Sequence, residues 1–130
     1  MGRLREEVVR RRILLVEGDR HNIDRLRDAF TEQGYECEVA LELAIARAIL
    51  AERLMHLLVL NADLCDVEHG ELIEGLKSQA PAMALVIYNG TADKSLQRKF
   101  RRMGADSYLS KASDLSAAIR SVQKVMTRRR

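Results

Sequence analysis

The chain has 130 residues, which suffices for one hydrophobic core but not for two independent ones. No apolar run approaches the roughly 20 residues of a membrane-spanning helix, and the first residues lack the apolar core of a signal peptide. The two cysteines, Cys37 and Cys65, show neither zinc-ligand spacing nor a disulfide framework. These features exclude membrane-spanning and disulfide-rich classes, and we expect a cytoplasmic protein.

The net charge of +3 hides a strong polarity along the chain. Residues 1–12 carry five basic and two acidic side chains. Residues 13–93 carry six basic and fifteen acidic ones, whereas residues 94–130 carry eleven basic and only two acidic ones. Such a polarised distribution argues against a neutral scaffold, and the polarity needs an explanation.

Apolar runs and helical spacing alternate along the sequence. Short runs and period-two alternation predict strands, and apolar residues three to four positions apart predict helices. In chain order, the predicted elements are a strand at 13–16, a helix at 23–30, a strand at 35–39, a helix at 43–51, a strand at 57–60, a helix at 72–76, a strand at 84–88, a helix at 96–103, a strand at 107–110 and a helix at 115–126. Gly34 and Gly104 are the predicted stops of two of these helices.

Strict alternation with short connections predicts a parallel sheet with helices on both faces. We expect one domain over residues 1–130, with its core at about residues 12–126 between a basic lead and an arginine tail. Ligands of such sheets bind at the carboxyl ends of the strands. The residues just after the predicted strands are therefore the candidate site: Glu17, Gly18, Asp19, Asn61, Asn89 and Lys111.

Four segments together resemble the receiver (CheY-like) domain of bacterial two-component systems. They are ILLVEGD, HLLVLN, PAMALVIYNG and MGADSYLSK, in that order, and the resemblance spans about residues 12–126. It implies a flavodoxin-like five-stranded parallel sheet of order 2-1-3-4-5 and a signalling role rather than an enzymatic one. In the family a strand-end aspartate takes a phosphoryl group, two further acidic residues hold Mg²⁺, and a lysine and a hydroxyl contact the phosphoryl oxygens.

This sequence departs from that pattern at several positions. The resemblance places Glu17 at the first acidic position, Gly18 at the second with Asp19 one place later, Asn61 at the phosphoacceptor position, Asn89 at the hydroxyl position, Tyr108 at the switch aromatic and Lys111 at the invariant lysine. An amide is a poor nucleophile and carries no charge to hold a cation. We therefore predict a receiver that acts without aspartyl phosphorylation and binds Mg²⁺ weakly or not at all, with Glu17 and Lys111 neutralising each other.

Several alternatives stay open at this point. Thr91 is the hydroxyl residue if the turn after residue 89 is longer than usual, and Asp63 is a non-standard phosphoacceptor candidate. Glu17 is alternatively an ordinary charged strand end, and Lys111 a surface lysine. Tyr108 alternatively packs on the sheet edge without switching.

The basic carboxyl-terminal part contains a candidate docking face. Five of its basic side chains belong to one predicted helix: Lys94, Arg98, Lys99, Arg101 and Arg102. Relatives use their fourth helix, fifth strand and fifth helix to dimerise or to meet partners, so a homodimer or an acidic protein partner is expected here. A basic module that associates with nucleic acid is the alternative, although few aromatic residues are available for stacking on bases. A merely solvated helix face is the third interpretation.

Overall fold

The structure is a computed structural model, and it describes residues 10–64, 69–89, 94–110 and 115–128. In chain order its elements are β1 (Arg12–Val16), α1 (Arg20–Glu32), β2 (Glu36–Ala40), α2 (Leu43–Glu52), β3 (Leu57–Asn61), a 3-10 turn η1 (Ala62–Leu64), α3 (His69–Gln79), β4 (Ala84–Asn89), α4 (Lys94–Arg102), β5 (Ser107–Ser110) and α5 (Leu115–Arg128). The predicted alternation of strands and helices is confirmed. The turn η1 was not predicted, because three residues are too few to show a periodic pattern.

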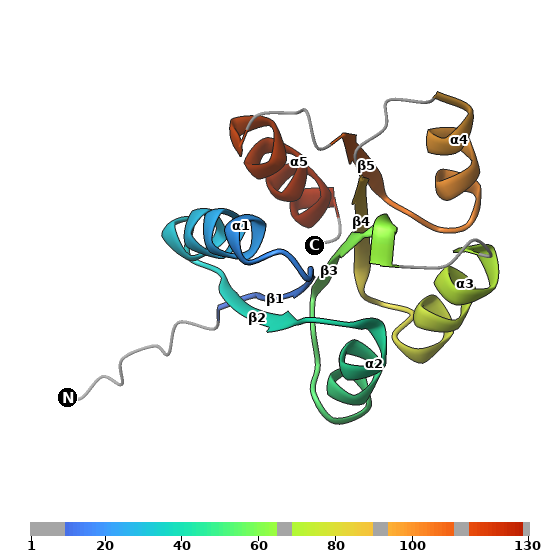
Figure 1. Cartoon of the computed structure of the whole chain (residues 1–130), viewed down its shortest axis with the longest axis horizontal. Coiled ribbons are helices and arrows are strands. Elements are labelled where there is room, and N and C mark those ends of the chain that lie inside the picture. The colour runs from blue at the N-terminus through green and yellow to red at the C-terminus, as the bar shows by residue number, and fades with distance from the viewer. Residues whose placement is uncertain (1–9, 65–68, 90–93, 111–114, 129–130) are drawn as a thin grey trace.

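The five strands form one parallel sheet of order β2-β1-β3-β4-β5 (Figure 1). This is the predicted order. Central β3 is buried along its whole length, which explains its continuous apolar sequence. Edge strand β2 is only partly buried, which explains its alternating sequence.

Helices cover both faces of the sheet (Figure 1). One apolar cluster joins the sheet to α1 and α5, through Phe30 and Val122 among others. The other joins it to α2, α3 and α4, where Ile73 and Phe100 are buried. Side chains alternate between these two clusters along each strand, so the position of a residue in its strand decides which helices it faces.

Three local features bound the helices. The Asp19 side chain caps α1 by accepting a hydrogen bond from the Asn22 backbone N–H at 3.2 Å. Gly34 and Gly104 follow α1 and α4 with φ of 95° and 113°, and both were predicted as helix stops. Helix α3 begins at His69, earlier than the predicted start at residue 72.

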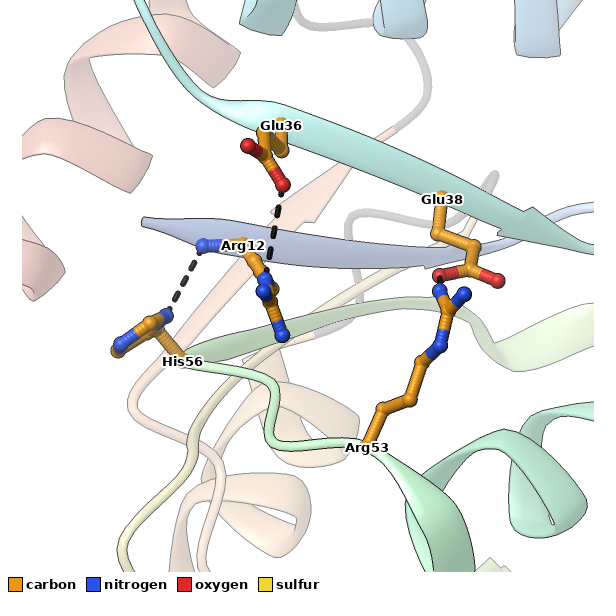
Figure 2. A network of polar contacts seen from close by, with 5 residues as sticks. All are labelled: Arg12, Glu36, Glu38, Arg53 and His56. Carbon is orange, nitrogen blue, oxygen red and sulfur yellow. Dashed lines mark hydrogen bonds and ion pairs between the residues drawn. The ribbon is translucent and has the colours of Figure 1, made fainter. Parts of the chain in front are cut away.

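Polar contacts gather at the amino-terminal end of β1, away from the candidate site (Figure 2). Arg12 pairs with Glu36 at 3.5 Å, and Arg53 pairs with Glu38. The His56 Nδ1 accepts a hydrogen bond from the Arg12 backbone N–H at 2.9 Å. The Arg12 contacts join the start of β1 to β2 and to the residue before β3, and the Arg53–Glu38 pair joins the end of α2 to β2. The carboxyl ends of the strands remain available for a site. Within the described ranges, no helix is both long enough and apolar enough to cross a bilayer.

Candidate functional site at the carboxyl ends of the strands

Three neighbouring strands bring Glu17, Asn61 and Tyr88 together. Asn61 pairs with Tyr88 across β3 and β4, and Val16 pairs with Leu60 across β1 and β3, so Glu17 lies beside Asn61. The backbone N–H of Glu17 also continues the pairing with β2, donating to the Ala40 carbonyl at 3.1 Å.

Period-two alternation explains why the three side chains share a face of the sheet. Two positions before Glu17, Asn61 and Tyr88 stand Leu15, Val59 and Val86 respectively, and these three belong to the apolar cluster beneath α1 and α5. Tyr88 belongs to that cluster itself. The site therefore extends the α1/α5 face of the sheet, at the carboxyl ends of β1, β3 and β4.

The Glu17 carboxylate is almost fully buried, with only 1% of the residue exposed. Its Oε2 accepts hydrogen bonds from the backbone N–H groups of Gly18 at 3.0 Å and Asp19 at 2.9 Å. Its Oε1 accepts one from the Asn61 side-chain amide at 3.1 Å and one from the Tyr88 hydroxyl. Four donors thus replace the water that this carboxylate loses on folding, which offsets much of the cost of burial.

Asn61 is also buried, at 3% exposed, and its amide has one defined orientation. Its Oδ1 accepts the Asp63 backbone N–H at 2.9 Å, so its Nδ2 is the atom that faces Glu17. An aspartate at this position would direct an oxygen rather than an N–H at the Glu17 carboxylate. An N–H donor at residue 61 therefore suits the negative charge of the Glu17 carboxylate.

Gly18 leaves the second acidic position without a side chain, although nothing in its surroundings requires glycine. A Cβ there would lie 3.6 Å from both the Leu41 carbonyl oxygen and the Leu64 Cδ2, which is ordinary contact. Its φ is not positive, because Gly34 and Gly104 are the positive-φ glycines of the described residues. Asp19 is exposed and engaged in capping α1.

These residues do not fit a Mg²⁺ ion, which requires oxygen ligands in near-octahedral geometry. Both Glu17 oxygens accept N–H or O–H donors, and the Asn61 oxygen accepts a backbone N–H. In the part of the chain that the structure describes, no three His, Cys, Asp or Glu side chains converge as a metal site would require. The donor set is that of a hydrogen-bonded anion, not of a metal site.

The remaining candidate positions are Asp63, Asn89, Lys111 and Thr91. Asp63 is exposed on η1, and its backbone rather than its carboxylate contacts Asn61. Asn89 ends β4, where its backbone pairs with Ser110. Lys111 and Thr91 lie outside the described residues, so their relation to the site stays a prediction.

Tyr108 occupies the opposite face of the sheet from Tyr88. It is buried in the cluster beneath α2, α3 and α4, and its ring stacks on Phe100 with centroids 5.7 Å apart. The aromatic side chain at the switch position is therefore packed inward against α4. Its switching role stays a prediction.

The predicted basic face lies on α4. Lys94, Arg98, Lys99, Arg101 and Arg102 are all exposed. None of the three ion pairs among the described residues involves them. This side of α4 is therefore basic.

The Cys37 side chain is free of a disulfide and lies in a partly buried environment. It is half buried on β2, and burial raises the pKa of its thiol to about 11, against a smaller opposing effect of Arg27. The thiol is therefore protonated at neutral pH and is a weak nucleophile.

Tyr88 is the site residue that the sequence analysis missed. It lies inside a strongly apolar run, where a tyrosine is expected to be a core residue. A signal was nevertheless present, since alternation puts position 88 on the face that also carries Val86 and Ala84. Combined with the strand order, this alternation places Tyr88 next to Asn61.

The strand order, the helices on both faces and a polar site at the carboxyl ends of the strands define a doubly wound α/β domain of the flavodoxin-like class. Residues 13–123 match the family described as the response regulator receiver domain, and the chain belongs to this family. Receiver domains are modules of two-component signalling that work with partner proteins, and they are not conventional enzymes.

Curated relatives include two regulatory proteins. The chain is 30% identical over 104 residues to the photosynthetic apparatus regulatory protein RegA of Rhodobacter capsulatus, covering 80% of this chain and 56% of RegA. It is 26% identical over 116 residues to the TorCAD operon transcriptional regulatory protein TorR of Escherichia coli (strain K12), covering 89% of this chain and 50% of TorR. The chain thus spans about half the length of these relatives.

Solved structures share the fold at low identity. A CheY-like response regulator receiver domain protein from Methanospirillum hungatei JF-1 matches with a TM-score of 0.83 and 23% identity, covering 93% of this chain and 97% of that one. The receiver domain of an HD domain-containing protein from Pseudomonas fluorescens Pf-5 matches with a TM-score of 0.82 and 24% identity, covering 93% and 98% of the two chains. These likenesses confirm the predicted fold.

Proposed function

We propose that this receiver domain transmits signals through protein contacts without phosphorylation of an aspartate. The observation that carries the proposal is the hydrogen bond between the Asn61 amide and the Glu17 carboxylate, at 3.1 Å and buried. The amide occupies the position of the nucleophilic aspartate, and its donor group satisfies the neighbouring acid as a cation otherwise would. Among the described residues the site is therefore a hydrogen-bonded cluster, and Mg²⁺ binds weakly or not at all.

The direct test is incubation of the intact chain with acetyl phosphate and Mg²⁺, followed by mass spectrometry. We expect no added phosphoryl group. A gain of one phosphoryl mass that hydroxylamine removes would overturn the proposal, because acyl phosphates are cleaved by hydroxylamine. That result would support the second candidate, phosphorylation at a non-standard residue such as Asp63, and peptide mapping would locate it.

Restoration of the acidic residues gives a sharper test of the two departures. Asn61→Asp alone restores a nucleophile but not the second acidic residue, so we expect little or no phosphorylation. Gly18→Asp with Asn61→Asp restores both, and the space around Gly18 accepts a Cβ. We expect the double variant to incorporate phosphate faster than either single one, and equal rates for Asn61→Asp and the double variant would contradict the assigned role of Gly18.

The exposed basic side chains of α4 support an acidic protein as the partner. A second copy of this chain, docked through α4, β5 and α5, is the other partner we propose to test, and nucleic acid is a further alternative. Binding of a short poly-glutamate peptide tests for an acidic protein partner, and binding of duplex DNA tests for nucleic acid. Sedimentation measures self-association of the chain. Arg98→Glu/Arg101→Glu should weaken peptide binding, with Arg47→Glu, at an exposed position on α2, as the control. Tighter binding of DNA than of the peptide, with a steep salt dependence, would contradict an acidic protein partner.

A further inference from the structure

Tyr88 contributes the one neutral side-chain hydroxyl among the four described donors to Glu17. Its residue is 6% exposed, and its ring belongs to the apolar cluster under α1 and α5. Phenylalanine would fill the same space, so packing by itself explains the ring but not the hydroxyl. The hydroxyl reaches the Glu17 Oε1, the oxygen that also accepts the Asn61 amide.

The two Glu17 oxygens differ in how firmly their donors are held. The donors on Oε2 include two backbone N–H groups, of Gly18 and Asp19, which the turn after β1 fixes in place. The donors to Oε1 are side chains, the Asn61 amide and the Tyr88 hydroxyl, and the same amide also lies 3.3 Å from Oε2. A divalent cation approaching Glu17 would therefore bind Oε1, and it would have to displace the Tyr88 hydroxyl as well as the Asn61 amide from that oxygen.

We propose that Tyr88 is a specificity-determining residue that excludes divalent cations from this pocket by keeping its hydroxyl on the Glu17 Oε1. This inference rests on the proposed function, because it explains how the pocket remains without a metal. Restoring aspartates at positions 18 and 61 leaves the Tyr88 hydroxyl as a barrier to cation binding. Cation affinity should return in full only when the tyrosine hydroxyl is removed as well.

The experiment compares Mg²⁺ binding by two restored variants, using amide NMR shifts during titration with MgCl₂. The first is Gly18→Asp/Asn61→Asp, and the second adds Tyr88→Phe. A hydrogen bond to a charged group is strong enough that its loss should tighten Mg²⁺ binding about tenfold or more. Tyr35→Phe in the same double background is the matched control, since the Tyr35 hydroxyl is not among the donors to Glu17, and it should leave the affinity unchanged.

Equal Mg²⁺ affinity with and without the Tyr88 hydroxyl would overturn the inference. The proposed function fails by a different result, phosphorylation of the unaltered chain by acetyl phosphate, so the two failures are distinguishable. A second measurement needs no restored variant: at low temperature the unaltered chain should show a slowly exchanging hydroxyl proton that is absent from Tyr88→Phe. A Tyr88 hydroxyl that exchanges with water as fast as that of Tyr35 would also overturn the inference.

Discussion

Burial of a carboxylate costs little free energy only when hydrogen-bond donors replace the water that the group loses. Glu17 illustrates this at the scale of one residue, since two backbone groups, an amide and a hydroxyl point at its oxygens. Each of these donors stabilises the negative charge of the carboxylate. We therefore expect the identity of residue 61 to affect the stability of the fold.

Asn61→Asp tests this electrostatic match. The change replaces a donor by a second carboxylate beside Glu17, so we expect a loss of about 2–3 kcal/mol in the free energy of unfolding at neutral pH. The loss should shrink at acidic pH, because one proton shared by the two carboxyl groups relieves their repulsion. Urea denaturation at both pH values measures it.

Asn22→Asp is the matched control for that prediction. It makes the same atomic change in the first turn of α1, where the helix dipole favours a carboxylate, so stability should be unchanged or slightly higher. Equal effects of the two substitutions would contradict a special role for the Asn61 amide.

At the scale of elements, the turns that end helices depend on glycine at defined places. Gly104 follows α4 with φ of 113°, and a Cβ there would also lie 3.4 Å from the Lys77 Cγ. Gly104→Ala should therefore lower the free energy of unfolding by about 1 kcal/mol or more. Gly75→Ala, inside α3 with open space around it, should raise it by about 0.5–1 kcal/mol. Thermal denaturation of both variants measures the contrast, and a destabilised Gly75→Ala or a fully stable Gly104→Ala would contradict it.

The hydrogen bond between Arg12, at the start of β1, and His56, just before β3, is predicted to be sensitive to pH. The His56 pKa lies below its ordinary value, mainly because burial disfavours the charged ring, with Arg11 and Arg12 adding repulsion. As the pH falls, the unfolded chain protonates His56 before the folded chain does. The contribution of neutral His56 to the free energy of unfolding is therefore complete above pH 6.5 and declines as the pH falls from there toward the folded-state pKa. Protonation of Nδ1 also removes the acceptor of the Arg12 N–H.

His56→Asn checks this prediction, because it keeps an acceptor near Nδ1 and does not titrate. Unfolding measured between neutral and mildly acidic pH should show a weaker pH dependence than in the unaltered chain. His21→Asn, at an exposed position on α1, should keep the original dependence. An unchanged pH dependence in His56→Asn would contradict the assignment.

At the scale of the whole molecule, two apolar layers on one sheet hold the fold together. Leu58 lies on central β3, is fully buried and belongs to the layer beneath α2, α3 and α4. Leu58→Ala should reduce the free energy of unfolding by about 2–5 kcal/mol, the range for a buried leucine that leaves a cavity. Leu54→Ala, at a residue that is 69% exposed, should change it by less than about 0.5 kcal/mol. Urea denaturation compares the two, and similar losses would contradict the described core.

Much of the architecture follows from local patterns. Apolar runs such as residues 57–60 and helical spacing such as residues 115–126 predict elements that the structure contains. The strand order was expected from the family resemblance and is confirmed. Glu17 and Asn61 were candidates because they stand at strand ends, where parallel strands bring polar side chains together.

The sequence alone determined which residues stand at the strand ends, and hence that an amide and a glycine replace two acidic side chains. It did not determine which donors surround the Glu17 carboxylate, because a hydrogen bond depends on distances between strands that are far apart in the chain. Tertiary structure decided that Tyr88, 71 residues beyond Glu17, contacts that carboxylate, and that the Asn61 amide presents its nitrogen rather than its oxygen. The physical reason is that strand register and side-chain alternation, acting together, choose the atoms that meet.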